Sequence, residues 1–152
     1  MNRTIYEEYI FGCILLLANK MQVWGDGIVE DITLKQWFLL MLISKMHATN
    51  PSVNEIADFS GTSRQNIKKM LGQLEKKGYV LMSKSETDAR ALCITLSDKT
   101  WTYFSKHEEK AADSVNKLFS SISDEELLVT SKTLEKLLVI FGNPKPDLEA
   151  MQ

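Results

Sequence analysis

The sequence has few of the residues that build metal sites, disulfide frameworks and catalytic centres. Its 152 residues include two cysteines and two histidines. Cys13 and Cys93 are too few and too far apart for a zinc motif or a disulfide framework, and His47 and His107 have no partners at metal-ligand spacing. Nucleophile elbows, phosphate-binding glycine loops and dinucleotide fingerprints are also missing. We therefore expect no metal, no cofactor, no catalytic residues and no enzyme activity.

Long hydrophobic runs are missing as well. The longest apolar run near the N-terminus, Ile14–Ala18, is too short to cross a bilayer. The chain starts with Arg3 followed by Glu7 and Glu8, unlike the basic start of a signal peptide. A composition of 44% hydrophobic and 25% charged residues is ordinary for a globular chain with a core. We expect a cytoplasmic protein with no membrane partner.

The charges are distributed unevenly, although the formal net charge is only −2. Between Thr62 and Lys84 six basic residues accompany one acid, Glu75, so this segment carries +5 and the remainder of the chain −7. A basic patch on an acidic body is a frequent design of small DNA-binding proteins. The six basic residues are Arg64, Lys68, Lys69, Lys76, Lys77 and Lys84.

Capping-box pairs predict where four helices begin. A Ser or Thr followed three residues later by Glu or Gln can satisfy backbone N–H groups at a helix start. The pairs are Thr33 with Gln36, Ser52 with Glu55, Thr62 with Gln65, and Ser123 with Glu126. Apolar spacing predicts further helices over about 5–24 and from Ser97 to about Phe119. Gly61, between the two short central helices, suits the left-handed turn of a helix-turn-helix.

Two alternating segments, Tyr79–Lys84 and Arg90–Leu96, predict a β-hairpin wing with a polar tip between them. The expected fold class is mainly α with this small hairpin: a winged helix-turn-helix with long N- and C-terminal helices. We assign 33–96 to a DNA-binding lobe, and 1–32 with 97–152 to a helical dimerisation region. The apolar stripes of the terminal helices exceed what one small winged helix can bury, which predicts a homodimer, although part of them must serve the chain's own core.

The helix over 63–77 separates into an apolar and a basic side when its residues are placed 100° apart. Ile67, Met70, Leu71 and Leu74 share the apolar side, and Gln65, Lys68, Lys69, Gly72 and Lys76 share the other. A major groove of double-stranded DNA accepts such a helix. A merely solvated face, or a winged-helix module that binds a protein partner without specific DNA binding, is the alternative.

Side-chain chemistry suggests how this helix would use its residues on DNA. Arg64 and Gln65 can read guanine and adenine edges with paired hydrogen bonds, and Ser63 and Asn66 are candidate helpers. The lysines suit phosphates, as point charges without base information. Those lysines are Lys68, Lys69 and Lys76.

The residues of this region resemble those of the multiple antibiotic resistance regulator (MarR) family. The stretch TSRQNIKKMLGQLEKKGYV (62–80) is similar to the family's recognition helix and first wing strand, and DARALCITLS (88–97) to its wing. The resemblance extends over about Tyr6–Phe141. It implies a transcription regulator, more often a repressor, that acts as a homodimer on an inverted-repeat operator. Interlocked first and last helices would form that dimer.

The resemblance also implies roles for wing residues. Arg90 would reach the minor groove and Asp88 would orient it, with a plain hairpin ion pair as the alternative. Lys84 adds a second basic group to the wing. Family wings are often more basic than this one, in which Glu86 and Asp88 oppose Lys84 and Arg90, so we expect a shallower salt dependence.

Effector sensing is a further implication. Many family members respond to small phenolic or other hydrophobic effectors, and such a pocket would here be lined by Trp24, Trp37, Phe38, Met41 and Met46. Aromatic and Met residues at helical spacing can equally be plain core. Other members sense oxidants through a cysteine of the first helix, where Cys13 lies, although a buried Cys can also be an inert small hydrophobe.

Overall fold

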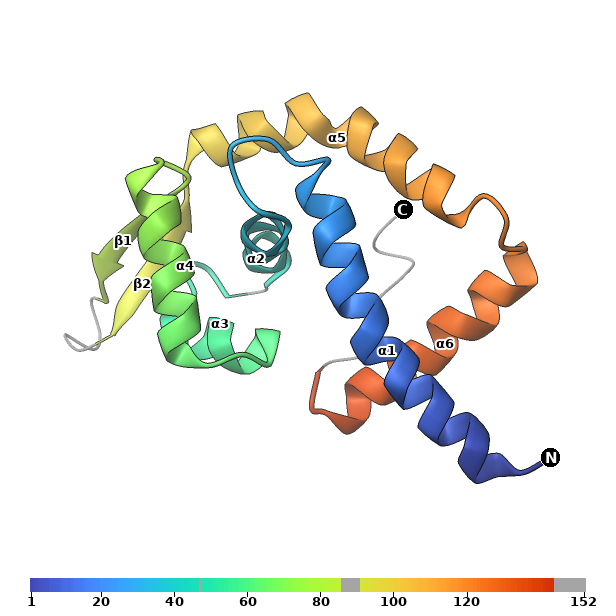
Figure 1. Cartoon of the computed structure of the whole chain (residues 1–152). Helices are drawn as coiled ribbons and strands as arrows, with labels where there is room; N and C mark the ends of the chain where they lie inside the picture. The colour runs from blue at the N-terminus through green and yellow to red at the C-terminus, as the bar shows by residue number, and fades with distance from the viewer. Residues whose placement is uncertain (47, 86–90, 144–152) are drawn as a thin grey trace. The chain divides into compact units, whose positions relative to one another are not determined.

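The computed structural model describes residues 1–46, 48–85 and 91–143, which form helices and one antiparallel hairpin (Figure 1). In chain order the elements are α1 (Arg3–Asp26), α2 (Leu34–Lys45), α3 (Val53–Ser60), α4 (Arg64–Lys76), β1 (Val80–Lys84), β2 (Leu92–Leu96), α5 (Asp98–Phe119) and α6 (Asp124–Ile140). The mainly helical fold with a small hairpin is therefore confirmed. Packing divides the chain into two units, 1–107 and 108–152, which we describe separately.

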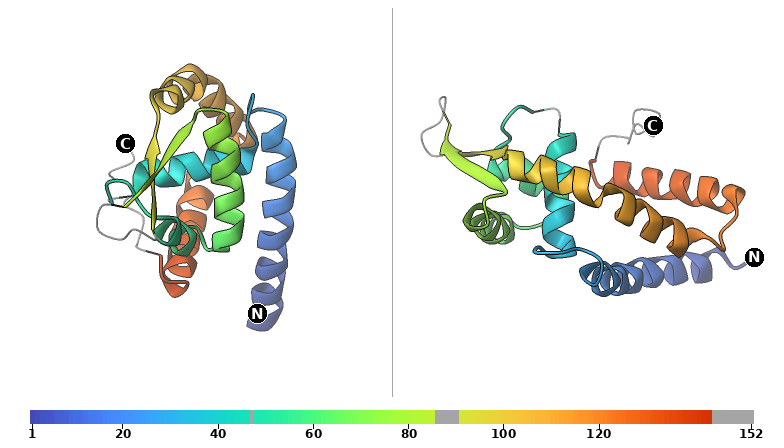
Figure 2. Two further views of the ribbon diagram at one scale, coloured as in Figure 1. Left: turned by 90° about the vertical axis from the view of Figure 1, so that its left-hand side faces the viewer. Right: turned by 90° about the horizontal axis from the view of Figure 1, so that it is seen from above.

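The core of the first unit lies between α2, α3, α4 and the hairpin. Leu40, Ile67, Leu71 and Val80 are completely buried there, and Tyr103 of α5 closes one side. Both views of the ribbon place α4 beside the hairpin (Figures 1 and 2). This packing holds one side of α4 against the protein and leaves its opposite side outward.

Three of the four expected capping boxes form. Gln36 donates its backbone N–H to Thr33 Oγ1 at 3.2 Å and accepts the Thr33 N–H at 3.1 Å. The same reciprocal pair joins Ser52 with Glu55, and the third starts α6. Each box satisfies N–H groups that the first helical turn leaves without partners. The sequence therefore located these helix starts to the residue.

The capping box predicted for α4 is wrong by one residue. Gly61 adopts the left-handed conformation (φ 67°), and the Thr62 N–H bonds the Ala57 carbonyl at 3.3 Å. Thr62 therefore closes the turn after α3, and Ser63 becomes the N-cap. The Ser63 hydroxyl accepts the Asn66 N–H at 3.2 Å.

The hairpin register places the expected apolar residues on one face. Val80 pairs with Leu96 and Met82 with Ile94, so these four side chains point to the same side, toward α4 and α2. The strands begin at Val80 and Leu92, later than predicted, and Arg90 lies outside the described residues. The segment before α3 lies along β2, because the Ile94 N–H donates a hydrogen bond to the Pro51 carbonyl at 3.0 Å.

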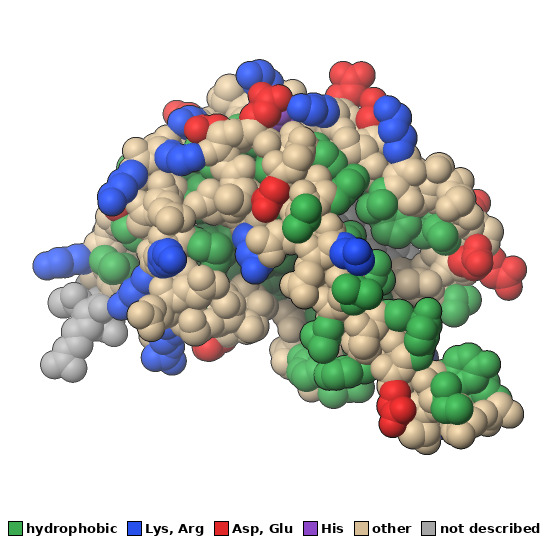
Figure 3. Space-filling model, viewed as in Figure 1, with side chains coloured by type: hydrophobic (Ala, Val, Ile, Leu, Met, Phe, Trp, Pro, Cys, Tyr) green, Lys and Arg blue, Asp and Glu red, His purple; other side chains and the backbone are tan. Residues whose placement is uncertain are grey.

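A close approach joins α1 to α2. Gly25 is buried, and a Cβ on it would lie 2.4 Å from Leu34 Cδ2, so a side chain at this position would require the Leu34 side chain to move. Asp26 Oδ1 accepts the Leu34 N–H at 2.6 Å. The rest of α1, which is longer than predicted at both ends, exposes most of its large apolar side chains, as Figure 3 shows over this helix.

The second unit contains the end of α5 and all of α6. Helix α6 and its C-cap also expose large apolar side chains, among them Leu128, Val139 and the C-cap Phe141. No helix among the described residues is long and apolar enough to cross a membrane. In the same part of the chain, no three His, Cys, Asp or Glu side chains are grouped so that they could hold a metal ion.

Candidate nucleic-acid interface

The two sides of α4 differ in burial as the helical wheel predicts. Ile67, Leu71 and Leu74 are buried in the core. The other side is exposed and polar, and the basic residues of this part of the lobe reach the surface in Figure 3. The exposed residues of α4 include Arg64, Gln65, Lys68, Lys69 and Lys76. The arrangement presents a hydrogen-bonding, positively charged helix face to the surroundings.

Local hydrogen bonds organise the first turn of α4. The Ser63 hydroxyl accepts from the backbone as the N-cap, so its own proton remains available for a bond to a ligand. The Asn66 side chain donates through Nδ2 to Thr62 Oγ1 at 3.1 Å. Part of the Asn66 amide is therefore used within the protein, whereas Arg64 and Gln65 extend from the same turn with exposed side chains.

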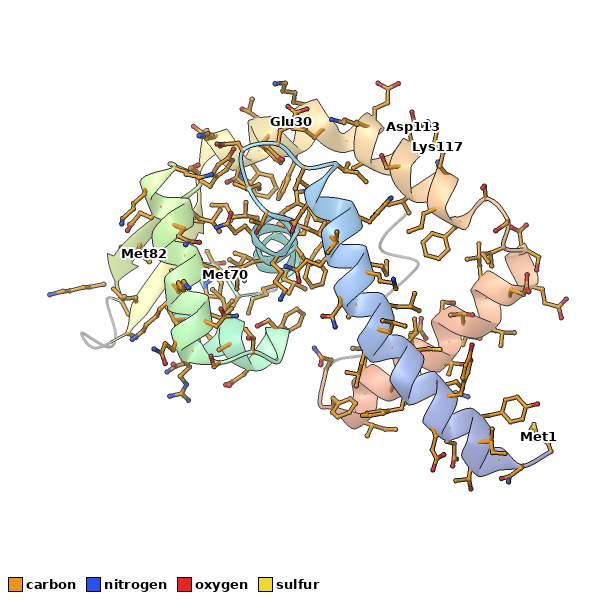
Figure 4. The ribbon with its side chains drawn as sticks, in the orientation of Figure 1. Met1, Glu30, Met70, Met82, Asp113 and Lys117 are labelled. Carbon is orange, nitrogen blue, oxygen red and sulfur yellow. The ribbon has the colours of Figure 1, made fainter. Side chains whose placement is uncertain are left out.

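Two contacts within the first unit involve charged residues of the 62–84 segment. Glu75 Oε1 accepts the Met82 N–H at 3.0 Å, which links α4 to β1; Figure 4 labels Met82 on the strand and Met70 on the helix. Lys77 Nζ lies 3.5 Å from Asp31 Oδ1. Lys77 therefore belongs to an ion pair at the end of the helix, and the cations of the exposed α4 face are Arg64, Lys68, Lys69 and Lys76.

On the wing, the structure describes one of the three predicted residues. Lys84 is exposed at the last paired position of β1, opposite Leu92. Asp88 and Arg90 lie outside the described residues, so their assigned roles stay predictions.

The residues predicted for effector binding come from the end of α1 and from α2 with its C-cap. Trp37, Met41 and Met46 are half-buried, and Trp37 and Met46 pack against the core of the first unit. Trp24 and Phe38 are exposed. These positions are compatible with core packing and with a binding surface alike, so the pocket stays a prediction.

A separate apolar groove of about 470 Å³ lies in the second unit, between the end of α5 and α6. None of the predicted effector residues lines it. Its lining residues are Phe119, Asp124, Leu127, Leu128, Thr130, Ser131 and Leu134.

Cys13 is half-buried on α1, one turn after Tyr9. A hydrogen bond with Cys13 raises the pKa of the Tyr9 hydroxyl above its ordinary value. This contact shows that the two side chains are neighbours on α1. It does not test oxidation of Cys13, which stays a prediction.

Sequence reasoning missed a set of residues at the junction between α4 and β1. Tyr79 is buried, and its hydroxyl donates to Asp31 Oδ2 at 2.7 Å. Burial and, secondarily, the Asp31 carboxylate raise the pKa of Tyr79, and the Tyr79 hydrogen bond lowers the pKa of Asp31. The two residues are 48 positions apart, so no local spacing signals their contact.

Comparison with known proteins places these features in a family. The MarR family model matches residues 32–92. The regulator YfiV of Bacillus subtilis is 31% identical over 97% of this chain and 100% of its own length. The transcriptional activatory protein BadR of Rhodopseudomonas palustris is 31% identical over 53% of this chain and 47% of its own length. The transcriptional repressor MprA of Escherichia coli is 28% identical over 90% and 77%.

Solved structures show the same fold. The MepR–DNA complex of S. aureus matches with a TM-score of 0.73 at 22% identity, over 87% of this chain and 96% of that one. BpsR of Bordetella bronchiseptica, whose DNA binding is regulated by 6-hydroxynicotinic acid, matches with a TM-score of 0.70 at 16% identity, over 84% and 97%. The winged helix-turn-helix, the outward basic face of α4 and the full-length match to a relative agree, and the chain belongs to the MarR family of transcription regulators.

Proposed function

We propose that the protein binds an inverted-repeat operator as a homodimer and represses transcription from it. The observation that carries the proposal is the division of α4 into a buried side, with Ile67 and Leu71, and an exposed basic side. A helix held in this way can enter a major groove without unfolding any of its own core. A regulator that acts on DNA in this manner acts in the cytoplasm, and it is not an enzyme.

Unburied apolar surface supports the homodimer. On α1, Phe11 is 67% exposed and Val23 is 76% exposed, and on α6 Ile140 is 76% exposed. Exposed apolar surface of this extent on each helix marks an interaction site, because it is costly to leave in water. We assign 1–32 and 97–152 to dimerisation, with a second copy as the partner, and 33–96 to DNA binding.

We assign roles on DNA by side-chain chemistry. Arg64 and Gln65 read base edges, with help from Ser63 and Asn66, because they extend from the first turn of the helix. The lysines bind phosphates. On the wing, Arg90 reaches the minor groove and Asp88 orients it. The phosphate-binding residues are Lys68, Lys69, Lys76 and Lys84.

We further propose that a small hydrophobic or phenolic effector releases the protein from DNA. The structural neighbour BpsR, which is regulated by 6-hydroxynicotinic acid, supports this class of ligand. Trp24, Trp37, Phe38, Met41 and Met46 are its proposed contacts. Oxidation of Cys13 is the competing trigger. Release of labelled operator by 6-hydroxynicotinic acid, compared with release by peroxide from wild type and Cys13→Ser, separates the two.

Selection of bound sequences from a random DNA pool tests the main proposal. The expected product is an inverted repeat whose half-sites lie about one helical turn apart. Arg64→Ala should lose preference for the selected site, whereas Lys106→Ala, an exposed lysine of α5, serves as the matched control. Failure to bind even random duplex at low salt would contradict the proposal and favour a protein-interaction module. A reporter gene placed behind the selected site then shows whether the protein represses.

A further inference from the structure

A polar cluster lies where α4 passes into β1, and none of the assignments above gives it a role. It consists of Asp31 from the α1–α2 connection, Lys77 and Tyr79 from the junction, and Lys99 from the first turn of α5; we call it the junction cluster. The Tyr79 hydroxyl donates to one Asp31 carboxylate oxygen at 2.7 Å, and Lys99 Nζ lies 3.8 Å from the same oxygen. Lys77 lies 3.5 Å from the other. One carboxylate therefore connects three segments of the first unit.

Tyr79 is held on every side. Only 1% of its surface is exposed. Its carbonyl accepts the Ser97 N–H at 3.0 Å and the Thr100 hydroxyl at 2.6 Å. Its ring packs edge-to-face on Tyr103 at 5.6 Å, and Lys99 Nζ lies 4.3 Å from its centre. Because the recognition helix ends just before Tyr79 and the wing begins just after it, the position of this residue sets the angle between the two.

Several contacts hold Asp31, although its side chain is half exposed and its backbone conformation is uncommon. Its φ of 64° lies in the left-handed region that residues other than glycine seldom adopt. Its carbonyl accepts a hydrogen bond from Lys77 Nζ, and the neighbouring Glu30 carbonyl accepts the Tyr103 hydroxyl at 2.9 Å (Figure 4 labels Glu30). Strained residues persist where the surrounding contacts determine them, and such sites are often functional.

We propose that Asp31 is a positioning residue for DNA binding, which fixes the angle between recognition helix and wing through Tyr79 and Lys77. This inference rests on the proposed function. Two DNA-contacting elements on a rigid joint bind more tightly than the same elements on a loose one, because the ordering cost is met during folding. An operator requires both elements in register at once, whereas random duplex accepts either element alone. Loosening the junction should therefore weaken operator binding more than random binding.

Three substitutions separate the contacts of the cluster. Asp31→Gly removes the carboxylate and suits the left-handed backbone. Asp31→Asn keeps an acceptor for the Tyr79 hydroxyl and tolerates the same backbone. Tyr79→Phe removes the hydroxyl alone. Each variant is titrated with the selected operator and with random duplex at a temperature where circular dichroism shows that it is fully folded. The concentration of protein able to bind DNA is determined separately by stoichiometric titration.

We expect Asp31→Gly and Tyr79→Phe each to lower operator affinity on the order of tenfold. Affinity for random duplex should change by less than about twofold. The double variant Asp31→Gly with Tyr79→Phe should lose no more operator affinity than Asp31→Gly alone, because the two substitutions remove the same hydrogen bond. Asp31→Asn should retain most of the operator affinity.

Equal losses on operator and random duplex, or an operator affinity like that of wild type, would overturn the inference. Were Asp31→Gly to fail to fold, Tyr79→Phe decides by the same comparison. A wild-type protein that binds no duplex at all refutes the proposed function. A wild type that selects its operator, with Asp31 and Tyr79 variants that do the same, refutes only the role of the junction cluster.

Discussion

The salt dependence of operator binding tests whether the exposed lysines contact phosphates. Lys68, Lys69, Lys76 and Lys84 are exposed in each protomer, so a homodimer offers eight. Each neutralised phosphate contributes about 0.9 to the slope of log affinity against log salt, which sets a slope near −7 if all eight engage. Lys69→Ala removes two of them. We expect its slope to be shallower by about 1.8, with about equal losses on operator and random duplex.

Fluorescence anisotropy between about 50 and 200 mM salt measures this slope. Lys106→Ala is the matched control, because it removes an exposed lysine of α5 and the same formal charge. Its slope should equal that of wild type. An unchanged slope for Lys69→Ala would show that Lys69 contacts no phosphate. An equal change for both variants would show that the overall charge, and not a contact of α4, sets the slope.

Four further outcomes follow from single residues. Arg64→Ala should weaken operator binding by about 1–3 kcal/mol in competition titrations, and an equal loss on random duplex would remove it from the base readers. Leu71→Ala, at a completely buried position, should lower the free energy of unfolding in urea by about 2–5 kcal/mol and leave the salt slope intact. Gly25→Ala adds a Cβ 2.4 Å from an α2 side chain, so calorimetry should show destabilisation of about 1–3 kcal/mol. Hydrogen bonds from the Ser52 backbone, and secondly from its side chain, lower the pKa of Glu55 in the folded protein below its ordinary value. The ionised Glu55 carboxylate therefore stabilises the fold above the ordinary pKa, and this stabilisation is lost as the pH falls through the lower pKa of the folded state. Glu55→Gln should flatten the dependence of the free energy of unfolding on pH in this range.

Local patterns in the sequence predicted the elements and their faces well. Capping boxes depend on residues three positions apart, and the Thr33 and Ser52 pairs form as expected. The faces of α4 depend on a 3.6-residue repeat, which places Ile67 and Leu71 in the core. The one-residue error at Thr62 arose because Thr62 has the capping-box partner Gln65, whereas the adjacent Ser63, without such a partner, caps the helix through its hydroxyl alone. The choice between them depends on how the turn at Gly61 closes, which is a tertiary outcome.

Local patterns could not predict contacts between residues far apart in the sequence. These contacts determine which charged residues of the 62–84 segment are paired within the protein. The sequence assigns +5 to the 62–84 segment, but Lys77 is paired with Asp31 and Glu75 bonds a backbone N–H of the wing. The hydrogen bond leaves the charge of Glu75 in place, and the ion pair offsets Lys77 with an acid from outside the segment. The cations of the exposed α4 face are then Arg64, Lys68, Lys69 and Lys76. What the pairing adds is geometry. Lys77 links the end of α4 to the α1–α2 connection, and a helix proposed to read bases needs that fixed direction as much as it needs positive charge.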